Sequence, residues 1–181
     1  STNTTALFFN TLNNLYALTL ERSKQAPEVV LKLSEIMEYI LYDAKEPRIR
    51  LLSEINYIQN YIDLEKLRYG DKVSVQINIQ GDIETQSVPP LLFLTFIENC
   101  FKHGTVENNK LNILIEFEVT HNNVLRFSVI NNYNSFTQNK KNHGIGNQNV
   151  LRRLELLYKD KFTLDIKTEK QSYIVELLIQ L

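Results

Sequence analysis

The 181-residue chain lacks tryptophan and has only one cysteine, one methionine and four prolines. A single cysteine excludes an internal disulfide and is typical of a reducing compartment. No apolar run reaches the roughly 18 residues of a membrane-spanning helix, and no signal-peptide pattern is visible. The 20 basic and 21 acidic residues are well mixed, so the net charge of −1 gives no electrostatic reason to expect nucleic-acid binding.

The chain does contain enough apolar residues for a core. Hydrophobic residues make up 43% of it, and 181 residues suit one or two small domains. Because the sequence starts at Ser1 rather than methionine, we expect a piece excised from something longer. Cys100 stands in an apolar run, which indicates a packed residue rather than a nucleophile.

The first 45 residues have the pattern of two helices. Apolar residues recur in two helical stripes, and the pattern breaks between Ser23 and Pro27, where proline suits a helix start. Two such helices with a short connection predict an antiparallel hairpin, and pairing two hairpins into a four-helix bundle would bury the apolar surface that one leaves exposed. We therefore expect a homodimer. The stripes are Phe8, Leu12, Leu15 and Thr19, then Val30, Leu33, Met37 and Ile40, widened by Val29, Ile36 and Leu41.

The rest of the chain predicts an α/β domain. Residues 45–47 are the best candidate boundary, which gives a hairpin at 1–46 and a second domain at 47–181. A short edge strand near Ile49 precedes a helix that we expect Ser53 to cap and Gly70 to end. Asn122 and Asn123 read as a hairpin turn. The predicted class is α+β, with helices on one face of a mixed sheet, a two-layer sandwich. Strand patterns cover residues 73–79, 111–119, 124–130, 162–166 and 173–181.

The stretch FIENCFKHG, residues 96–104, is the most informative part of the sequence. It ends an apolar run that follows two prolines and reads as a largely buried helix. Glu98 and Lys102 are spaced i, i+4 and Asn99 and Lys102 i, i+3, so the three share one helical edge. A carboxylate, a neutral oxygen ligand and a cation suit a hydrated divalent metal bound to phosphates. The competing interpretation is an i, i+4 ion pair on a core helix.

A second motif, HGIGNQNV at residues 143–150, opens another amphipathic helix. Two glycines before a helix let the backbone approach a ligand and leave N–H groups facing an anion. Alone, such a pair often serves only a turn. An acid-Asn-x-x-Lys helix, two strands and then a glycine pair at a helix start form a more specific combination. The expected apolar residues of this helix are Val150, Leu151, Leu154, Leu157 and Tyr158.

These motifs resemble the ATP-binding domain of histidine kinases and their relatives, the GHKL or Bergerat-fold ATPases. FIENCFKHG, and GIGNQNVLRRLELLY after it, are similar to the LytS-like branch of sensor histidine kinases, and the resemblance covers essentially the whole chain. It implies the catalytic fragment of a two-component kinase that uses ATP and Mg²⁺. The γ-phosphoryl would pass to a histidine on the hairpin and then to a response regulator. It also implies the cytoplasmic portion of a membrane-anchored bacterial sensor kinase, whose upstream sensor region is absent from this chain.

The resemblance assigns roles to the first motif. Asn99 matches the asparagine that ligates Mg²⁺, Glu98 the acid that positions or activates the attacking group, and Lys102 the base that faces the phosphates. ATP carries about four negative charges, and phosphoryl transfer needs metal and cations to spread the developing charge. His103 also matches the motif, with a backbone contact at the helix end as the alternative.

The resemblance also implies a short ATP lid at residues 133–143, which is polar and without periodicity. Lys140 and Lys141 could reach phosphates there, or belong simply to a solvated basic loop. Arg152 or Arg153 could also approach a phosphate, with surface ion pairing as the alternative. The residues implied for nucleotide binding are Gly144, Ile145 and Gly146 of the glycine box, with Asn149 and Arg153 of the N-x-x-x-R-L pattern.

Asn131 stands where the family's next box normally holds an aspartate that accepts a hydrogen bond from the adenine amino group. LytS-like kinases often carry asparagine here, and a carboxamide oxygen can still accept from the amine. The exchange removes charge assistance from that bond. The alternative is that Asn131 and Asn132 only make a turn.

The largest departure from the family lies at Ala6. LytS-like kinases carry a phosphoacceptor motif close to Pro-His-Phe-Leu-Phe-Asn-x-Leu-Asn, whereas residues 5–13 read TALFFNTLN. Ala6 occupies the histidine position, and no histidine precedes His103. Residues from a cloning vector, a deliberate substitution and a natural pseudo-acceptor are the competing explanations. The polar run 1–5, with no helical pattern, favours the first.

Two functions remain open at this stage. The first is the histidine kinase fragment, a transferase, although this chain lacks its own acceptor. The alternative is a non-catalytic dimer scaffold that senses nucleotide or docks a partner. A hydrolysing ATPase of the same fold is disfavoured by the helical hairpin and by the absence of a transducer domain.

Overall fold

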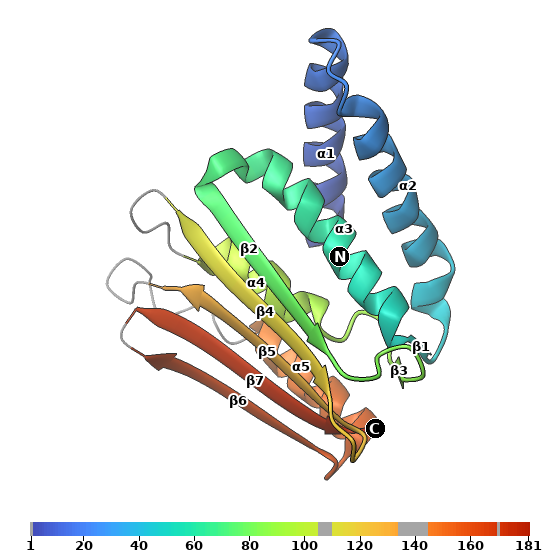
Figure 1. Cartoon of the computed structure of the whole chain (residues 1–181), viewed down its shortest axis with the longest axis vertical. Coiled ribbons are helices and arrows are strands. Elements are labelled where there is room, and N and C mark those ends of the chain that lie inside the picture. The colour runs from blue at the N-terminus through green and yellow to red at the C-terminus, as the bar shows by residue number, and fades with distance from the viewer. Residues whose placement is uncertain (1, 105–109, 134–144, 170) are drawn as a thin grey trace. The chain divides into compact units, whose positions relative to one another are not determined.

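The computed structural model describes residues 2–104, 110–133, 145–169 and 171–181 (Figure 1). The chain divides into two compact units, one of Ser1–Asp71 with Val88–Pro90 and the other of Lys72–Ser87 with Leu91–Leu181. The third helix thus lies in the same compact unit as the hairpin. A functional boundary at residues 46–47 stays a prediction.

The first unit is helical. It consists of α1 (Thr2–Leu20), α2 (Ala26–Leu41), a 3-10 turn η1 (Asp43–Lys45) and α3 (Leu51–Tyr69), and its short strand β1 (Ile49–Arg50) pairs with β3 (Ser87–Val88). The predicted hairpin therefore forms. Ser53 does not cap α3, because this helix already starts at Leu51 behind Arg50. Gly70 ends it with φ of 58°, a conformation that glycine adopts without strain.

Two expectations about the hairpin need correction. The polar run at the start is not irregular, since α1 already begins at Thr2. The buried stripes match the predicted ones only in part. Val29, Leu33 and Ile36 are buried as predicted, whereas Leu12, Val30 and Met37 keep 50%, 47% and 46% of their surface exposed. Each helix carries apolar residues over a wider arc than the hairpin buries, so the sequence pattern alone does not show which of them face the partner helix. The side chains actually buried are Leu7 and Thr11 in α1, and Val29, Leu33, Ile36 and Tyr39 in α2.

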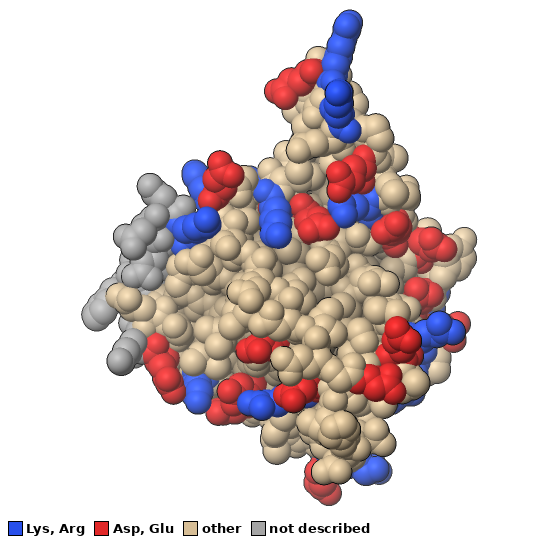
Figure 2. Space-filling model, in the orientation of Figure 1, with Lys and Arg blue, Asp and Glu red and all other residues tan. Residues whose placement is uncertain are grey.

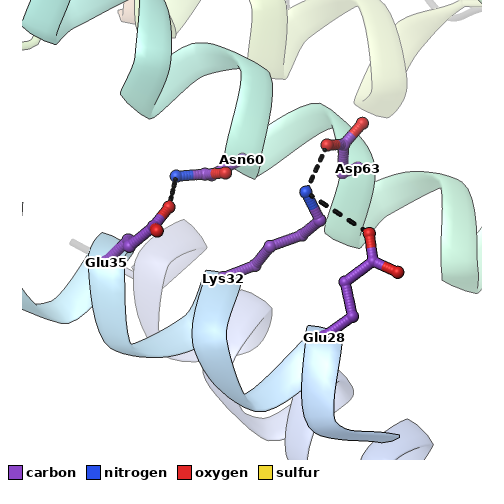
Figure 3. A network of polar contacts seen from close by, with 5 residues as sticks. All are labelled: Glu28, Lys32, Glu35, Asn60 and Asp63. Atoms are coloured by element: carbon purple, nitrogen blue, oxygen red, sulfur yellow. Dashed lines mark hydrogen bonds and ion pairs between the residues drawn. The ribbon is translucent and has the colours of Figure 1, made fainter. Parts of the chain in front are cut away.

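Polar contacts tie α2 to α3. The Lys32 ammonium lies 2.8 Å from Asp63 and 3.7 Å from Glu28 (Figure 3). Its hydrogen bond to Asp63, followed by the charges of nearby carboxylates, raises the pKa of Lys32 against the opposing effect of burial. Asn60 donates to Glu35 at 2.7 Å one turn further along. These contacts fix the pairing of the two helices on their solvent side.

The second unit is a five-stranded sheet with two helices. Its strand order is β2-β4-β5-β7-β6, with β2 parallel to β4 and the other neighbours antiparallel. Figure 1 shows α4 and α5 on one side of this sheet. The predicted α/β sandwich and strand patterns are confirmed. The bounds are β2 (Val73–Gln80), β4 (Leu111–Val119), β5 (Val124–Asn132), β6 (Phe162–Glu169) and β7 (Ser172–Gln180), with α4 (Leu94–His103), α5 (Ile145–Tyr158) and the 3-10 turn η2 (Gly70–Lys72).

The core of this unit lies between sheet and helices. Alternate residues of β4, β5 and β7 are buried, as the period of a strand requires. Phe93 and Phe96 pack against Phe117 and Phe127 of the sheet, with ring centroids 4.9 to 5.9 Å apart. Helix α4 begins only at Leu94, because a turn with Leu91 at φ of 60° separates it from the prolines. The two prolines therefore do not open the helix as predicted.

The charged side chains on the surface include both signs. Figure 2 shows acidic and basic side chains interspersed on the viewed face, with no large area of one sign. Within the described ranges, no helix is both long and apolar enough to cross a membrane.

Candidate functional site

The polar edge of α4 lies opposite its buried face. Phe96, Ile97 and Cys100 pack into the core, which turns Glu98 and Asn99 to a half-buried edge and leaves Lys102 exposed. Lys102 forms no ion pair with any residue that the structure describes, Glu98 included. The interpretation of this motif as a simple ion pair is therefore wrong.

Cys100 is a core residue, as predicted. It is 1% exposed, and its thiol donates to the Phe96 carbonyl at 3.3 Å. Burial raises the pKa of the thiol to about 12, so it stays protonated and unreactive at neutral pH.

Gly104 ends α4 directly against β5. A Cβ atom at this position would lie 2.3 Å from the Cys100 carbonyl oxygen, 2.5 Å from a methyl of Leu111 and 3.2 Å from the amide nitrogen of Asn131. Only glycine fits without displacing backbone. The end of the metal-binding helix predicted from the sequence is thereby brought against the predicted adenine residue.

Asn131 lies inside β5 and not in a turn, so the turn interpretation is wrong. It is 2% exposed and points to the same face as the buried Phe127 and Val129. Its Nδ2 donates to the Asn132 carbonyl at 2.9 Å, which fixes the orientation of the amide, and its Oδ1 has no hydrogen-bond partner among the described residues. A buried acceptor without a donor is costly, so this oxygen suits a ligand that brings an N–H group.

Asn99 joins a chain of polar side chains. Its Nδ2 donates to Oδ1 of Asn147 at 3.2 Å, and Nδ2 of Asn147 donates to the Tyr173 hydroxyl at 3.0 Å. Burial is the main cause of a raised pKa at Tyr173, which keeps the phenol protonated. The bond of Asn99 uses its nitrogen, so the oxygen is the end of this amide that is chemically able to ligate a metal.

The remaining predicted residues are less well defined. Asn149 on α5 is exposed and Arg153 half-buried, while His103 is half-buried at the last position of α4. Ile145 and Gly146 are the first residues of α5. Gly144 and most of the predicted lid, with Lys140 and Lys141, lie outside the described residues.

The stripe predicted for α5 is only partly right. Val150, Leu154 and Tyr158 are buried, but Leu151 and Leu157 are 39% and 48% exposed. Ala6, the predicted acceptor position, is exposed on α1, in the other unit.

Sequence reasoning missed three residues that shape the site. Gly104 stood inside the quoted first motif, and a glycine directly after a buried helix was a usable signal of close packing. Asn147 stood inside the second motif, between the glycines and Asn149. Tyr173 had no signal in the sequence, because its role depends on how β7 lies next to α5.

The donor set suits magnesium rather than a fully protein-bound metal. No group of three or more histidine, cysteine, aspartate or glutamate side chains gathers among the described residues. Mg²⁺ commonly keeps waters and binds phosphates with only one or two protein oxygens. A single carboxamide oxygen at Asn99 is consistent with that mode.

Comparison with solved structures identifies the class of fold. The histidine kinase domain of the Erythrobacter litoralis EL346 blue-light activated kinase aligns with a TM-score of 0.55 at 16% identity, over 98% of this chain and 96% of that one. The Acinetobacter baumannii histidine kinase AdeS aligns with a TM-score of 0.54 at 8% identity, over 91% and 83%. The fold is that of histidine kinases.

Sequence comparison narrows this class. The family model described as histidine kinase matches residues 6–73, and its match begins at Ala6. The sensor histidine kinase/phosphatase LytS of Staphylococcus aureus strain MRSA252 is 33% identical over 97 residues, which are 54% of this chain and 17% of that protein. The chain thus corresponds to a small part of the curated relatives it matches. With the motifs, these findings confirm the predicted resemblance of this chain to LytS-like sensor histidine kinases.

Proposed function

We propose that this chain is the catalytic fragment of a two-component sensor histidine kinase, and that its second unit binds Mg·ATP. The observation that carries the proposal is the buried oxygen of Asn131, which has no donor among the described residues. The amide of Asn131 lies beside Gly104, at the end of the helix that presents Asn99. One site thus offers an acceptor for the adenine amino group and an oxygen ligand for the metal.

The residues present fit both groups. Asn131 would accept from the amine of adenine, and Asn99 would give Mg²⁺ its protein ligand. The metal supplies charge neutralisation between the phosphates, which phosphoryl transfer needs. The glycine box at 144–146 would let backbone N–H groups approach the phosphates at the start of α5.

Two residues of α4 would act on the transfer itself. Lys102 is exposed and forms no ion pair within the described residues, so its ammonium is available to face the phosphates. Glu98 would orient the accepting imidazole or take its proton. Asn149 and Arg153 on α5, together with His103, complete the set proposed to surround the nucleotide. The contribution of the protein is positioning and electrostatics, as in other phosphoryl transfers.

The first unit would supply dimerisation. Large apolar side chains remain exposed on both helices of the hairpin, among them Phe9 at 65%, Tyr16 at 67% and Leu31 at 59%. A second hairpin would cover them in a four-helix bundle. In the complete protein, a response regulator would receive the phosphoryl group, and an upstream sensor region would anchor this part on the cytoplasmic side of the membrane.

One observation favours a second candidate, a nucleotide-sensing scaffold without phosphoryl transfer. Ala6 cannot accept a phosphoryl group, although its exposed position on α1 could accommodate a histidine instead. The kinase proposal needs a histidine at this position in the native protein. A native alanine would favour the scaffold.

Calorimetric titration of the chain with ADP, with Mg²⁺ and with a chelator, tests the proposal. We expect Mg²⁺ to strengthen binding. Asn99→Ala removes the proposed metal ligand and should lower the Mg²⁺-dependent affinity by roughly 10- to 100-fold or more, since mutating residues that only hydrogen-bond to metal ligands already has an effect of this size. If the Asn99→Ala protein binds ADP as tightly as the unmodified chain, Asn99 is not part of the site. If the unmodified chain does not bind ADP at all, the proposal of a nucleotide site is wrong.

A further inference from the structure

A metal ligand made of a carboxamide has an orientation problem. Its oxygen can bind Mg²⁺ but its NH₂ group cannot, and the two ends have nearly the same size. Turning the amide of Asn99 by half a turn would present the nitrogen to the metal. A half-buried asparagine on a helix therefore needs a neighbour that distinguishes its two ends.

Asn147 lies at that position. Its Oδ1 accepts from Nδ2 of Asn99 at 3.2 Å, so the bond holds the nitrogen of Asn99 and turns its oxygen away from Asn147. The other end of Asn147 is engaged too, since its Nδ2 donates to the Tyr173 hydroxyl at 3.0 Å. Reversing every bond in this chain would direct the oxygen of Asn99 at Asn147 and withdraw it from the metal.

Tyr173 comes from β7 and is anchored independently of both helices. It pairs with Asn131 in the ladder between β5 and β7, and its ring lies 6.0 Å from that of Tyr133. Its hydroxyl oxygen accepts from Nδ2 of Asn147 at 3.0 Å, and burial raises the pKa of the phenol, so the hydroxyl stays protonated at neutral pH.

We propose that Asn147 and Tyr173 are positioning residues, which orient the carboxamide of Asn99 so that its oxygen faces the metal of the bound nucleotide. The inference rests on the proposed function. It assigns roles to two residues for which the resemblance gave none, and it connects α5, which begins inside the glycine box, to the proposed metal ligand.

The first test replaces Asn147 by leucine, which removes the acceptor and keeps a side chain branched at the same carbon. Calorimetric titration with ADP is performed with Mg²⁺ and again with a chelator. We expect Asn147→Leu to weaken the Mg²⁺-dependent affinity about tenfold, or about 1.4 kcal/mol, and to leave the metal-free affinity unchanged. Gln148→Leu is the matched control, since Gln148 is the next residue on α5, is exposed and loses the same group.

The second test measures whether the two residues act in series. Tyr173→Phe alone should weaken Mg²⁺-dependent binding by about two- to fivefold, because Asn147 can then turn, and should add nothing in the Asn147→Leu protein. Additive losses would mean that Tyr173 does not act through Asn147, and would overturn that part of the inference.

The outcomes separate this inference from the proposed function. If the unmodified chain binds ADP without any gain from Mg²⁺, the proposed function fails and the positioning role fails with it. If the unmodified chain shows the gain and Asn147→Leu keeps it, the positioning role alone is wrong. If Asn147→Leu loses affinity equally with and without metal, Asn147 merely holds α5 against α4, and the inference is overturned.

Discussion

The two units differ in what their structures leave unsatisfied. In the helical unit, nine large apolar side chains of described residues 9–42 remain exposed, so its deficit is apolar. The sandwich unit has an aromatic core, and among its described residues Oδ1 of Asn131 is buried without a hydrogen-bond partner. Apolar surface is satisfied by another protein surface, whereas a buried acceptor is satisfied by a hydrogen-bond donor. The comparison thus supports the proposals that the first unit mediates association and that the second binds a ligand.

The largest expected effect is a loss of association that leaves ligand binding unchanged. Leu12→Asp places a charge on the exposed face of α1 and should weaken the proposed dimer by about 3 kcal/mol, on the order of a hundredfold, because two copies of the side chain lose their burial. Sedimentation at micromolar concentration measures it. Leu156→Asp is the control, since Leu156 is a 73% exposed leucine of the sandwich unit. A dimer that survives Leu12→Asp, or one that Leu156→Asp disrupts, would reverse the assignment of the two units.

The next effect concerns the junction of α4 and β5. Gly104→Ala should lower the free energy of unfolding by about 1–3 kcal/mol, because its Cβ would collide with the Cys100 carbonyl and with Leu111. Urea unfolding followed by circular dichroism measures the loss. A protein with unchanged stability would show that this junction is looser than the structure indicates.

Asn131→Leu should separate stability from binding. An apolar side chain at this buried position removes the oxygen for which the described residues supply no donor, so stability should stay within about 1 kcal/mol of the unmodified protein or rise. The affinity for ADP should fall about three- to tenfold, the value of one neutral hydrogen bond. Melting curves and calorimetry on the same samples check both quantities. Unchanged affinity would exclude Asn131 from the adenine site.

The smallest effect lies between α2 and α3. Lys32→Met removes the partly buried pair with Asp63 and should cost about 0.2–1 kcal/mol near neutral pH. Since the pKa of Lys32 is raised in the folded state, the stabilisation is complete below the usual lysine value of 10.5 and is lost as pH rises through the folded value. Urea unfolding at increasing pH should therefore show the two proteins converging. A difference that persists unchanged at high pH would assign the loss to packing rather than to charge.

The fold was largely predictable because its signals are local. Strict alternation over 73–79 and 111–119 predicts strands of the sheet, and the strands β2 and β4 form there. The predictions that failed depend on long-range packing. Ser53 does not cap α3, because the helix already begins at Leu51. Which apolar residues of α2 are buried depends on how α3 packs against it.

The candidate site could be predicted only in part, and the roles of its residues stay predictions. Asn99 and Asn131 were identified by resemblance, but not the contacts that orient them. Asn147 reaches Asn99 only because α4 and α5 pack side by side, and Tyr173 joins them from a strand with no motif. Residue spacing along the chain cannot encode such contacts between distant segments.

The most direct measurement restores the acceptor. The unmodified chain, Ala6→His, and Ala6→His combined with Asn99→Ala are each incubated with Mg²⁺ and γ-labelled ATP. The account predicts acid-labile, base-stable labelling of Ala6→His alone, because only that protein has both an exposed acceptor on α1 and an intact metal ligand. An Ala6→His protein that binds nucleotide yet remains unlabelled, or labelling that persists without Asn99, would contradict it.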